Sequence, residues 1–288
     1  EFGTDKPDLR NPLRIVDTTD FFQRCTFKPF HGKTVRAIKV HADMSKGFHE
    51  KLLKFAQSIG MGGLGYLEVL EDKSYKGPID KFIPDDMKQE IADIANLEVG
   101  DTIFFIADTE EHAALYAGQI RNELGARLDL LEKNAYRFCF INDFPMFEYD
   151  KEAKKIIFTH NPFSMPQGGL EALNTKDPRD ILAYQYDIVC NGVELSSGAV
   201  RNHNLDIMVK AFEIAGYTEE DLKEKFGALY NAFQFGAPPH AGMAPGVDRM
   251  IMLLRNEENI REVIPFPMNG NAQDLMCGAP NEVTEQQL

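Results

Sequence analysis

The sequence lacks any apolar run that approaches the ~18–20 residues needed to span a bilayer. Its first eight residues, Glu-Phe-Gly-Thr-Asp-Lys-Pro-Asp, also lack the basic and apolar blocks of a signal peptide. Cysteine is scarce: the four residues Cys25, Cys139, Cys190 and Cys277 have no CxxC spacing, which argues against a zinc site or a disulfide framework. These absences predict a cytoplasmic protein with no membrane partner.

Positive charge is also scarce, and the formal net charge is −14. Because phosphate backbones are bound by Lys and Arg, this balance argues against the chain as a main nucleic-acid anchor. Such a partner would need local basic patches or a part of the protein outside this chain. The glycine cluster at residues 60–63 is not followed by Lys-Ser/Thr, so it does not indicate a nucleotide-binding loop.

The 288 residues leave room for two domains, and composition is ordinary for a globular protein, with 43% hydrophobic and 26% charged residues. Residues 1–13 form a polar leading segment, and residues 14–128 alternate between strand-like and helix-like runs. In this second region the patterns predict strands at 35–40, 64–70 and 102–107, and helices at 49–59, 85–94 and 110–124.

Residues 129–288 show a different order of predicted elements, with strands followed by helices. Residues 185–190 followed by Asn191-Gly192 give the strongest hairpin signal. Further strands are predicted at 136–142 and 155–159, joined through a turn at 150–153, and helices at 205–215, 219–230 and 247–254. The fold class predicted for the whole chain is α+β, with antiparallel strands and helices packed on one face.

Residues 242–249, Gly-Met-Ala-Pro-Gly-Val-Asp-Arg, are the most informative stretch. Flexible glycines allow close backbone approach to a ligand, and the planar, permanently charged Arg249 suits a phosphate. Val247, Ile251 and Leu254 lie at i, i+4 and i+7, which predicts the core face of a helix with Arg249 roughly 200° away from Val247. The alternative is a plain surface helix with Asp248 as its first-turn acid.

Glu194 and Arg201 lie seven residues apart, so a regular strand would place them on opposite faces. A bulge at residues 196–198, or a two-residue turn at Ser197-Gly198, would bring the carboxylate and the guanidinium together. The alternative is a structural ion pair. His160 follows a predicted strand, and a lone histidine of this kind is more often structural than a ligand.

The stretch at 242–249 resembles the third signature motif of class II aminoacyl-tRNA synthetases. Six further stretches are similar to the bacterial-type aspartyl-tRNA synthetase family, at residues 3–10, 143–147, 160–163, 191–195, 236–242 and 259–264. The resemblance covers nearly the whole chain. It implies a partial class II catalytic core of antiparallel strands, with residues 14–128 as an inserted smaller α+β domain of the GAD type and residues 129–288 as the later catalytic part.

The resemblance also implies roles for individual residues. Arg249 would be the catalytic residue that touches the tail phosphate of ATP, and Gly246, Val247 and Asp248 would bind ATP beside it. Glu194 would hold ATP, through Mg²⁺, an ion that prefers oxygen ligands and substrate phosphates.

His160 and Arg201 would bind the aspartate substrate, because an anionic side chain pairs with their charges. Many relatives have a second histidine where this chain has Asn161, a departure that removes one titratable group.

The function that the resemblance implies is ATP-dependent ligation of L-aspartate to tRNA(Asp) through aspartyl-adenylate. One alternative is relaxed specificity for both tRNA(Asp) and tRNA(Asn). Another is a non-catalytic tRNA-binding module, and a third is an amide-forming enzyme on the same fold. The first two signature motifs of the class are absent, so we expect the isolated chain to be inactive and the intact enzyme to be a homodimer.

Overall fold

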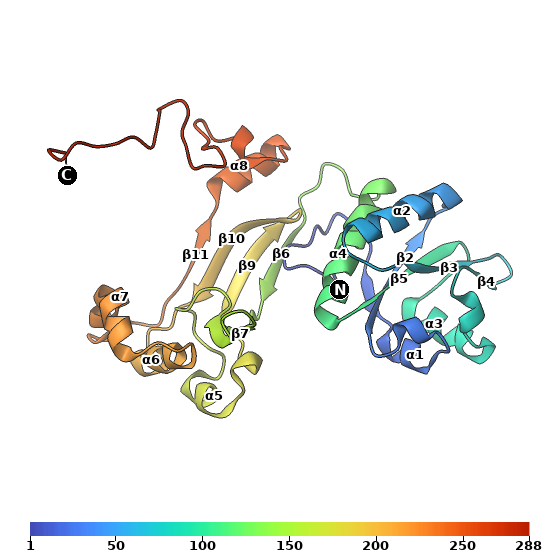
Figure 1. Ribbon diagram of the computed structural model, residues 1–288, viewed down its shortest axis with the longest axis horizontal. Helices are drawn as coiled ribbons and strands as arrows, with labels where there is room; N and C mark the ends of the chain where they lie inside the picture. The colour runs from blue at the N-terminus through green and yellow to red at the C-terminus, as the bar shows by residue number, and fades with distance from the viewer. Residues whose placement is uncertain (288) are drawn as a thin grey trace. The chain divides into compact units, whose positions relative to one another are not determined.

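The computed structural model describes residues 1–287 and divides into two compact units. The first contains residues 1–138 and 190–192, and the second contains residues 139–189 and 193 onward (Figure 1). The domain limits expected at 13/14 and 128/129 stay a prediction. None of the helices within residues 1–287 is long and apolar enough to cross a membrane.

The first unit is built on a five-stranded sheet in the order β1-β2-β5-β3-β4. The printed pairings along this order are all antiparallel, and β2 pairs with β5 over eight positions. The predicted strands and helices of this region are confirmed, although residues 85–87 form a short 3-10 turn ahead of the third helix. The elements are β1 (Ile15–Asp17), α1 (Thr19–Arg24), β2 (Thr34–His41), α2 (Lys46–Ser58), β3 (Gly65–Val69), β4 (Tyr75–Lys76), α3 (Lys88–Ala95), β5 (Asp101–Asp108) and α4 (Glu110–Arg127).

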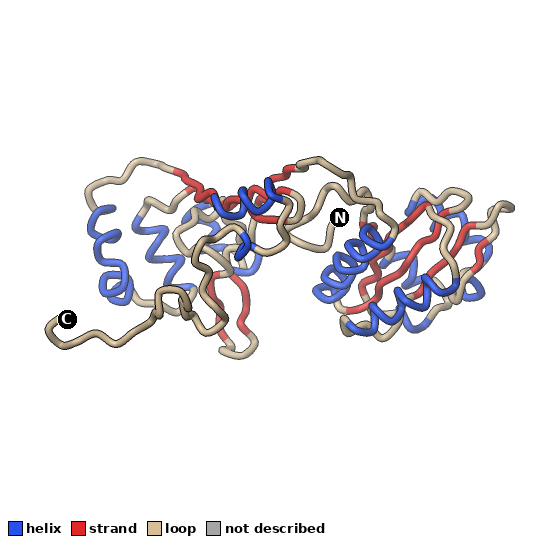
Figure 2. The backbone as a smooth tube through the Cα atoms, turned by 90° about the horizontal axis from the view of Figure 1, so that it is seen from above, coloured by secondary structure: helices blue, strands red, loops and turns tan. Residues whose placement is uncertain are grey.

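The two central strands bury both of their faces. On β2, Val35 belongs to one hydrophobic core and Ile38 to the other, and on β5 the neighbours Phe104 and Phe105 are divided in the same way. Helices α1 and α3 cover the first core, and α2 and α4 cover the second. Figure 2 shows helices on both sides of these strands. The unit is therefore a three-layer sandwich, since period-two alternation supplies two apolar faces.

The helices α2 and α4 begin at side-chain caps. The Ser45 hydroxyl accepts from the backbone N–H of Phe48, and the Thr109 hydroxyl accepts from that of His112. Each cap satisfies one of the N–H groups that a helix start leaves without an intrahelical partner. The spacing of the sequence predicted both helices, and the caps show where they begin: α4 at the predicted residue 110, and α2 at Lys46, three residues before the predicted start.

Residues of the leading segment are bound to α4 by Arg121, whose side chain is fully buried. Its guanidinium donates to the carbonyl oxygens of Leu13 at 2.8 Å, Asp8 at 3.0 Å and Asn11 at 2.7 Å. Burial lowers the pKa of this guanidinium, yet an arginine stays charged in proteins. Two of these contacts, to Leu13 and Asn11, are buried, and the one to Asp8 is partly buried, so a charged donor satisfies carbonyl groups that are shielded from water.

The second unit contains a four-stranded sheet in the order β11-β10-β9-β6, a separate β7-β8 hairpin and four helices. The α+β prediction for the chain is confirmed. The elements are β6 (Phe138–Asn142), β7 (Phe147–Asp150), β8 (Lys155–Phe158), α5 (Gly169–Thr175), β9 (Gln185–Cys190), β10 (Val193–Val200), α6 (Leu205–Ile214), α7 (Glu219–Phe233), β11 (Ala241–Pro245) and α8 (Val247–Arg255).

The predicted β9-β10 hairpin is confirmed. Asn191 and Gly192 have φ values of 52° and 83°, the left-handed pair that a tight hairpin turn requires. The connection expected between the strands at 136–142 and 155–159 is wrong, because β7, which was not predicted, pairs with β8 across the turn at 150–153.

Candidate functional site

The candidate site is built on β10 and β11 of the second unit. These strands pair antiparallel in unbroken register, from Ser196↔Pro245 to Val200↔Ala241. Directly after β11, the backbone N–H of Gly246 donates to the carbonyl oxygen of Leu195 at 2.7 Å. This bond fixes the start of α8 beside the start of β10, so the residues at 246–249 lie next to Glu194.

Arg249 and Glu194 are in direct contact. The guanidinium Nη1 donates to the Glu194 carbonyl oxygen at 2.7 Å and lies 3.3 Å from the carboxylate Oε1. The Arg249 side chain is 45% exposed and that of Glu194 is 22% exposed, so the pair remains accessible to a ligand. A Cβ at Gly246 would lie 3.4 Å from Cδ of Arg249, which shows how closely the arginine folds over this glycine.

The predicted core face of α8 is wrong. Val247 is 63% exposed and Leu254 is 69% exposed, whereas Met252 is the buried residue of the helix. Met252 lies three positions after Arg249, on the same side of the helix. Because Gly246 anchors the helix start against β10, the Arg249 side packs toward the strand, and the apolar stripe is left exposed within residues 1–287. Asp248 is an exposed acid in the first turn, where the helix dipole favours it.

The pairing of β10 with β11 shows neither the turn nor the bulge that was predicted to bring Glu194 and Arg201 together. The two-residue turn is wrong, because β10 runs straight through Ser197 and Gly198. No extra residue interrupts the register with β11 between Ser196 and Val200. Seven residues of strand separate Glu194 from Arg201 by roughly 20 Å. Glu194 and Arg201 therefore lie at opposite ends of β10.

Arg201 and the loop that contains His160 lie side by side. The backbones of Ser164 and Arg201 form an isolated antiparallel β-bridge, and the N–H of Asn202 donates to the carbonyl oxygen of Phe163 at 2.7 Å. His160 is exposed, and its ring packs edge-on against Phe144 at 5.0 Å. The Asn161 carboxamide accepts from the N–H of Phe163 at 2.9 Å, so this departure from the family pattern closes the loop turn.

Two histidines surround the backbone of Arg201. The Arg201 N–H donates to the carbonyl oxygen of His240 at 2.9 Å, and Nδ1 of His203 lies 3.4 Å from the carbonyl oxygen of Arg201. The two imidazole rings are 6.4 Å apart. Sequence analysis gave neither histidine a role. His203 lies two residues after Arg201, so the sequence could indicate that the two are close. His240 lies 39 residues after Arg201, and only the structure shows that it is near.

Tyr186 and Gly198 were also missed as site residues. The Tyr186 hydroxyl donates to the carbonyl oxygen of Gly242 at 3.1 Å and so links β9 to β11 across β10. A Cβ at Gly198 would lie 2.4 Å from Cε2 of Tyr186 and 2.6 Å from the Gly242 oxygen. A glycine inside a strand often marks close approach of another group, and this signal was present in the sequence.

Replacement of Gly198 by alanine should therefore destabilise the second unit by about 1–3 kcal/mol, because the ring and the β11 backbone must move. Urea unfolding followed by circular dichroism measures this loss. Gly242→Ala is the matched control on the paired strand, since its Cβ would meet nothing within 4 Å. Equal stability of the two variants would contradict the packing described.

The chemistry available here is that of anion binding. The site offers a guanidinium at each end of β10 and one carboxylate, Glu194. Within residues 1–287 no group of three His, Cys, Asp or Glu side chains is arranged to hold a metal ion. Magnesium, however, is commonly held by one or two carboxylates together with substrate phosphates, so Glu194 fits that more limited role.

Comparison with known proteins identifies the family of the chain. The family model described as tRNA synthetases class II (D, K and N) matches residues 1–270. The aspartate–tRNA(Asp/Asn) ligase of Ehrlichia canis (strain Jake) is 54% identical over 294 aligned positions, which cover 100% of this chain and 50% of that protein. The enzyme of the same name from Zymomonas mobilis is 53% identical, with 100% and 49% covered. The chain thus spans about half the length of these curated relatives.

Among solved structures, the aspartyl tRNA synthetase from Entamoeba histolytica matches with a TM-score of 0.37 and 19% identity, over 84% of this chain and 44% of that one.

Proposed function

Because this chain belongs to the class II tRNA synthetases of the D, K and N group, we propose that the full-length protein ligates L-aspartate to tRNA(Asp). The aspartate α-carboxylate attacks the α-phosphate of ATP and gives aspartyl-adenylate and pyrophosphate. A hydroxyl of the 3′-terminal adenosine of tRNA then attacks the acyl carbon, takes the aspartyl group and releases AMP. No protein nucleophile is needed, and catalysis depends on positioning and on charge neutralisation.

The observation that carries this proposal is the contact between Arg249 and Glu194. Gly246 fixes the start of α8, so that Arg249 stands accessible beside a carboxylate on the adjoining strand. In the proposed function, the Arg249 guanidinium binds the tail phosphate of ATP, and Val247 and Asp248 complete the nucleotide side of the site. Glu194 would contribute one carboxylate ligand to Mg²⁺, which neutralises phosphate charge when bound.

The opposite end of β10 would then receive the amino acid. Arg201 is the group proposed to pair with the aspartate side-chain carboxylate, because a planar guanidinium binds a carboxylate through two parallel hydrogen bonds. His160, on the loop beside Arg201, is proposed as a second contact to aspartate. An uncharged asparagine side chain would leave the guanidinium without its pair, which supports selection of aspartate.

A second candidate is ligation to both tRNA(Asp) and tRNA(Asn), and the printed names of the relatives favour it. Charging of purified tRNA(Asp) and tRNA(Asn) by the full-length protein separates the two. We expect aspartate to be attached to tRNA(Asp). Comparable charging of tRNA(Asn) would establish the dual specificity, and failure to charge either would refute both.

Two further expectations follow from the same proposal. We propose a homodimer for the full-length enzyme, which sedimentation would test. We also propose a cytoplasmic location. All four cysteines are free thiols in the structure, which is consistent with a reducing compartment.

A further inference from the structure

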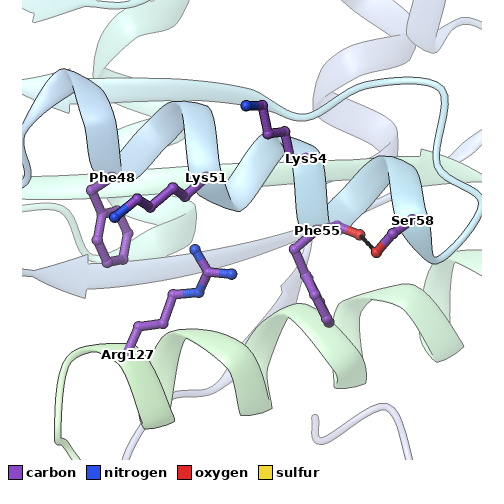
Figure 3. Close-up of a pocket in the computed structure, with 6 residues that line it drawn as sticks. All are labelled: Phe48, Lys51, Lys54, Phe55, Ser58 and Arg127. Atoms are coloured by element: carbon purple, nitrogen blue, oxygen red, sulfur yellow. Dashed lines mark hydrogen bonds between the residues drawn. The ribbon is translucent and has the colours of Figure 1, made fainter.

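A shallow hollow of about 620 Å³ lies between α2 and the end of α4, in the first unit. Five of its lining residues come from α2 and one comes from the last turn of α4 (Figure 3). The lining consists of three cationic, two aromatic and one hydroxyl side chain: Lys51, Lys54, Arg127, Phe48, Phe55 and Ser58. We call this surface the α2–α4 hollow. It plays no part in the proposed active site.

The two lysines of the hollow are available for an anion. Helix α2 carries three lysines and one glutamate, although the whole chain is strongly acidic. Within residues 1–287 neither Lys51 nor Lys54 lies in an ion pair, whereas Lys46 faces Glu50 at 3.9 Å. Lys51 and Arg127 extend into the gap from the two helices, and Lys54 stands on the outer side of α2 (Figure 3). Locally, this surface has the charge that a polyanion requires.

The Arg127 guanidinium is already held in place. Its Nε donates to a carboxylate oxygen of Glu123, one helical turn earlier, at 2.6 Å, and its Nη2 pairs with the same oxygen. This contact limits the side chain's freedom, so less entropy is lost when a phosphate binds to the remaining N–H groups. The glutamate reduces the local positive charge, but it does not cancel Lys51 and Lys54.

The aromatic side chains give the hollow an apolar floor. Phe48 and Phe55 lie seven residues apart on one face of α2 and pack against the second hydrophobic core. Both are only partly buried, so ring surface remains at the bottom of the hollow. Aromatic faces beside a track of cations are the combination that binds nucleotide bases and their phosphates together. A purely solvated lysine face would lack this floor.

We propose that the α2–α4 hollow binds tRNA, with Lys51, Lys54 and Arg127 on backbone phosphates and Phe55 against a base or ribose. The choice of RNA over another polyanion rests on the proposed function, which requires tRNA. The surface gives an acidic chain a local positive contact for a strongly negative substrate.

The test compares three forms of the full-length protein in tRNA(Asp) binding by fluorescence anisotropy over a range of salt concentrations. The first is the unmodified protein, and the second is Lys51→Gln/Lys54→Gln/Arg127→Gln. The third is the matched control Lys28→Gln/Lys33→Gln/Lys81→Gln, which removes three exposed charges from the same unit away from the hollow. Both variants therefore change net charge equally.

We expect the hollow variant to bind tRNA at least ~10-fold more weakly at low salt. Its slope of log affinity against log salt should be smaller by about 2–3, because roughly 0.7–0.9 is lost for each phosphate contact removed. The control should change either quantity only slightly. Equal losses in the two variants would show a general charge effect and overturn the proposal, as would unchanged binding in the hollow variant.

The proposed function is judged separately, by aspartate-dependent exchange of pyrophosphate into ATP with the unmodified protein, a reaction that needs no tRNA. If the unmodified protein supports exchange but the hollow variant and its control bind tRNA equally, only the proposal for the hollow fails. Absence of exchange, with tRNA binding still dependent on the hollow, defeats the proposed function alone.

Discussion

Replacement of Arg249 by alanine in the full-length protein should lower aspartate-dependent pyrophosphate exchange at least ~10-fold. The Arg249 side chain is 45% exposed and its guanidinium is anchored on Glu194, so it can turn one edge to a phosphate while the other stays bound. Loss of one charge-assisted contact to a phosphate that gains charge in the transition state corresponds to about 1.4 kcal/mol or more. The steady-state rate of exchange at saturating aspartate measures the effect.

Arg255→Ala provides the control for this prediction. Arg255 is an exposed cation in the last turn of the same helix, and it lies away from the Gly246 anchor. Its removal takes the same charge from α8 but leaves the Glu194 contact intact, so exchange should change less than ~2-fold. Exchange that is unchanged in Arg249→Ala, or equally reduced in both variants, would remove the assignment of Arg249.

Replacement of Arg121 by methionine should destabilise the first unit by about 2–4 kcal/mol. Methionine keeps most of the apolar stem, but it removes the donor from three backbone carbonyl groups, two in buried contacts and one in a partly buried contact. Each buried acceptor left without a partner costs roughly 1 kcal/mol or more, and relief of the buried charge offsets part of that sum. Urea unfolding followed by circular dichroism gives the difference in free energy of unfolding.

Arg24→Met serves as the comparison for Arg121. Arg24 forms an ion pair with Glu90 on the surface, with more than half of its side chain exposed. Water and salt screen exposed ion pairs, so this variant should remain close to the unmodified protein in its free energy of unfolding. A loss in Arg121→Met no larger than that in Arg24→Met would show that the leading segment does not depend on the buried guanidinium.

Features that depend on neighbours within a few residues were predicted correctly. The turn at Asn191-Gly192 follows from two residues that tolerate positive φ. The strands β2 and β5 follow from runs of β-branched and aromatic residues. The helices α2 and α4 begin close to hydroxyl caps at Ser45 and Thr109.

Features that depend on distant segments were missed or misassigned. The apolar stripe of α8 was placed in a core, but attachment of Gly246 to Leu195, 51 positions earlier, sets the other side of the helix on β10. Gly198 indicated a turn or bulge when taken alone. Only the pairing of β10 between β9 and β11 shows that it makes room for Tyr186.

By itself, the order of residues determined most of the longer helices and strands, the α+β class and the chemical nature of the groups at 194, 201 and 249. The tertiary structure alone decided that Arg249 meets Glu194 and that Arg201 stands at the far end of the same strand. The physical reason is the sequence distance over which each interaction acts. Backbone preferences and caps act over a few residues, whereas the partner of a side chain is fixed by strand register and by where each helix is anchored.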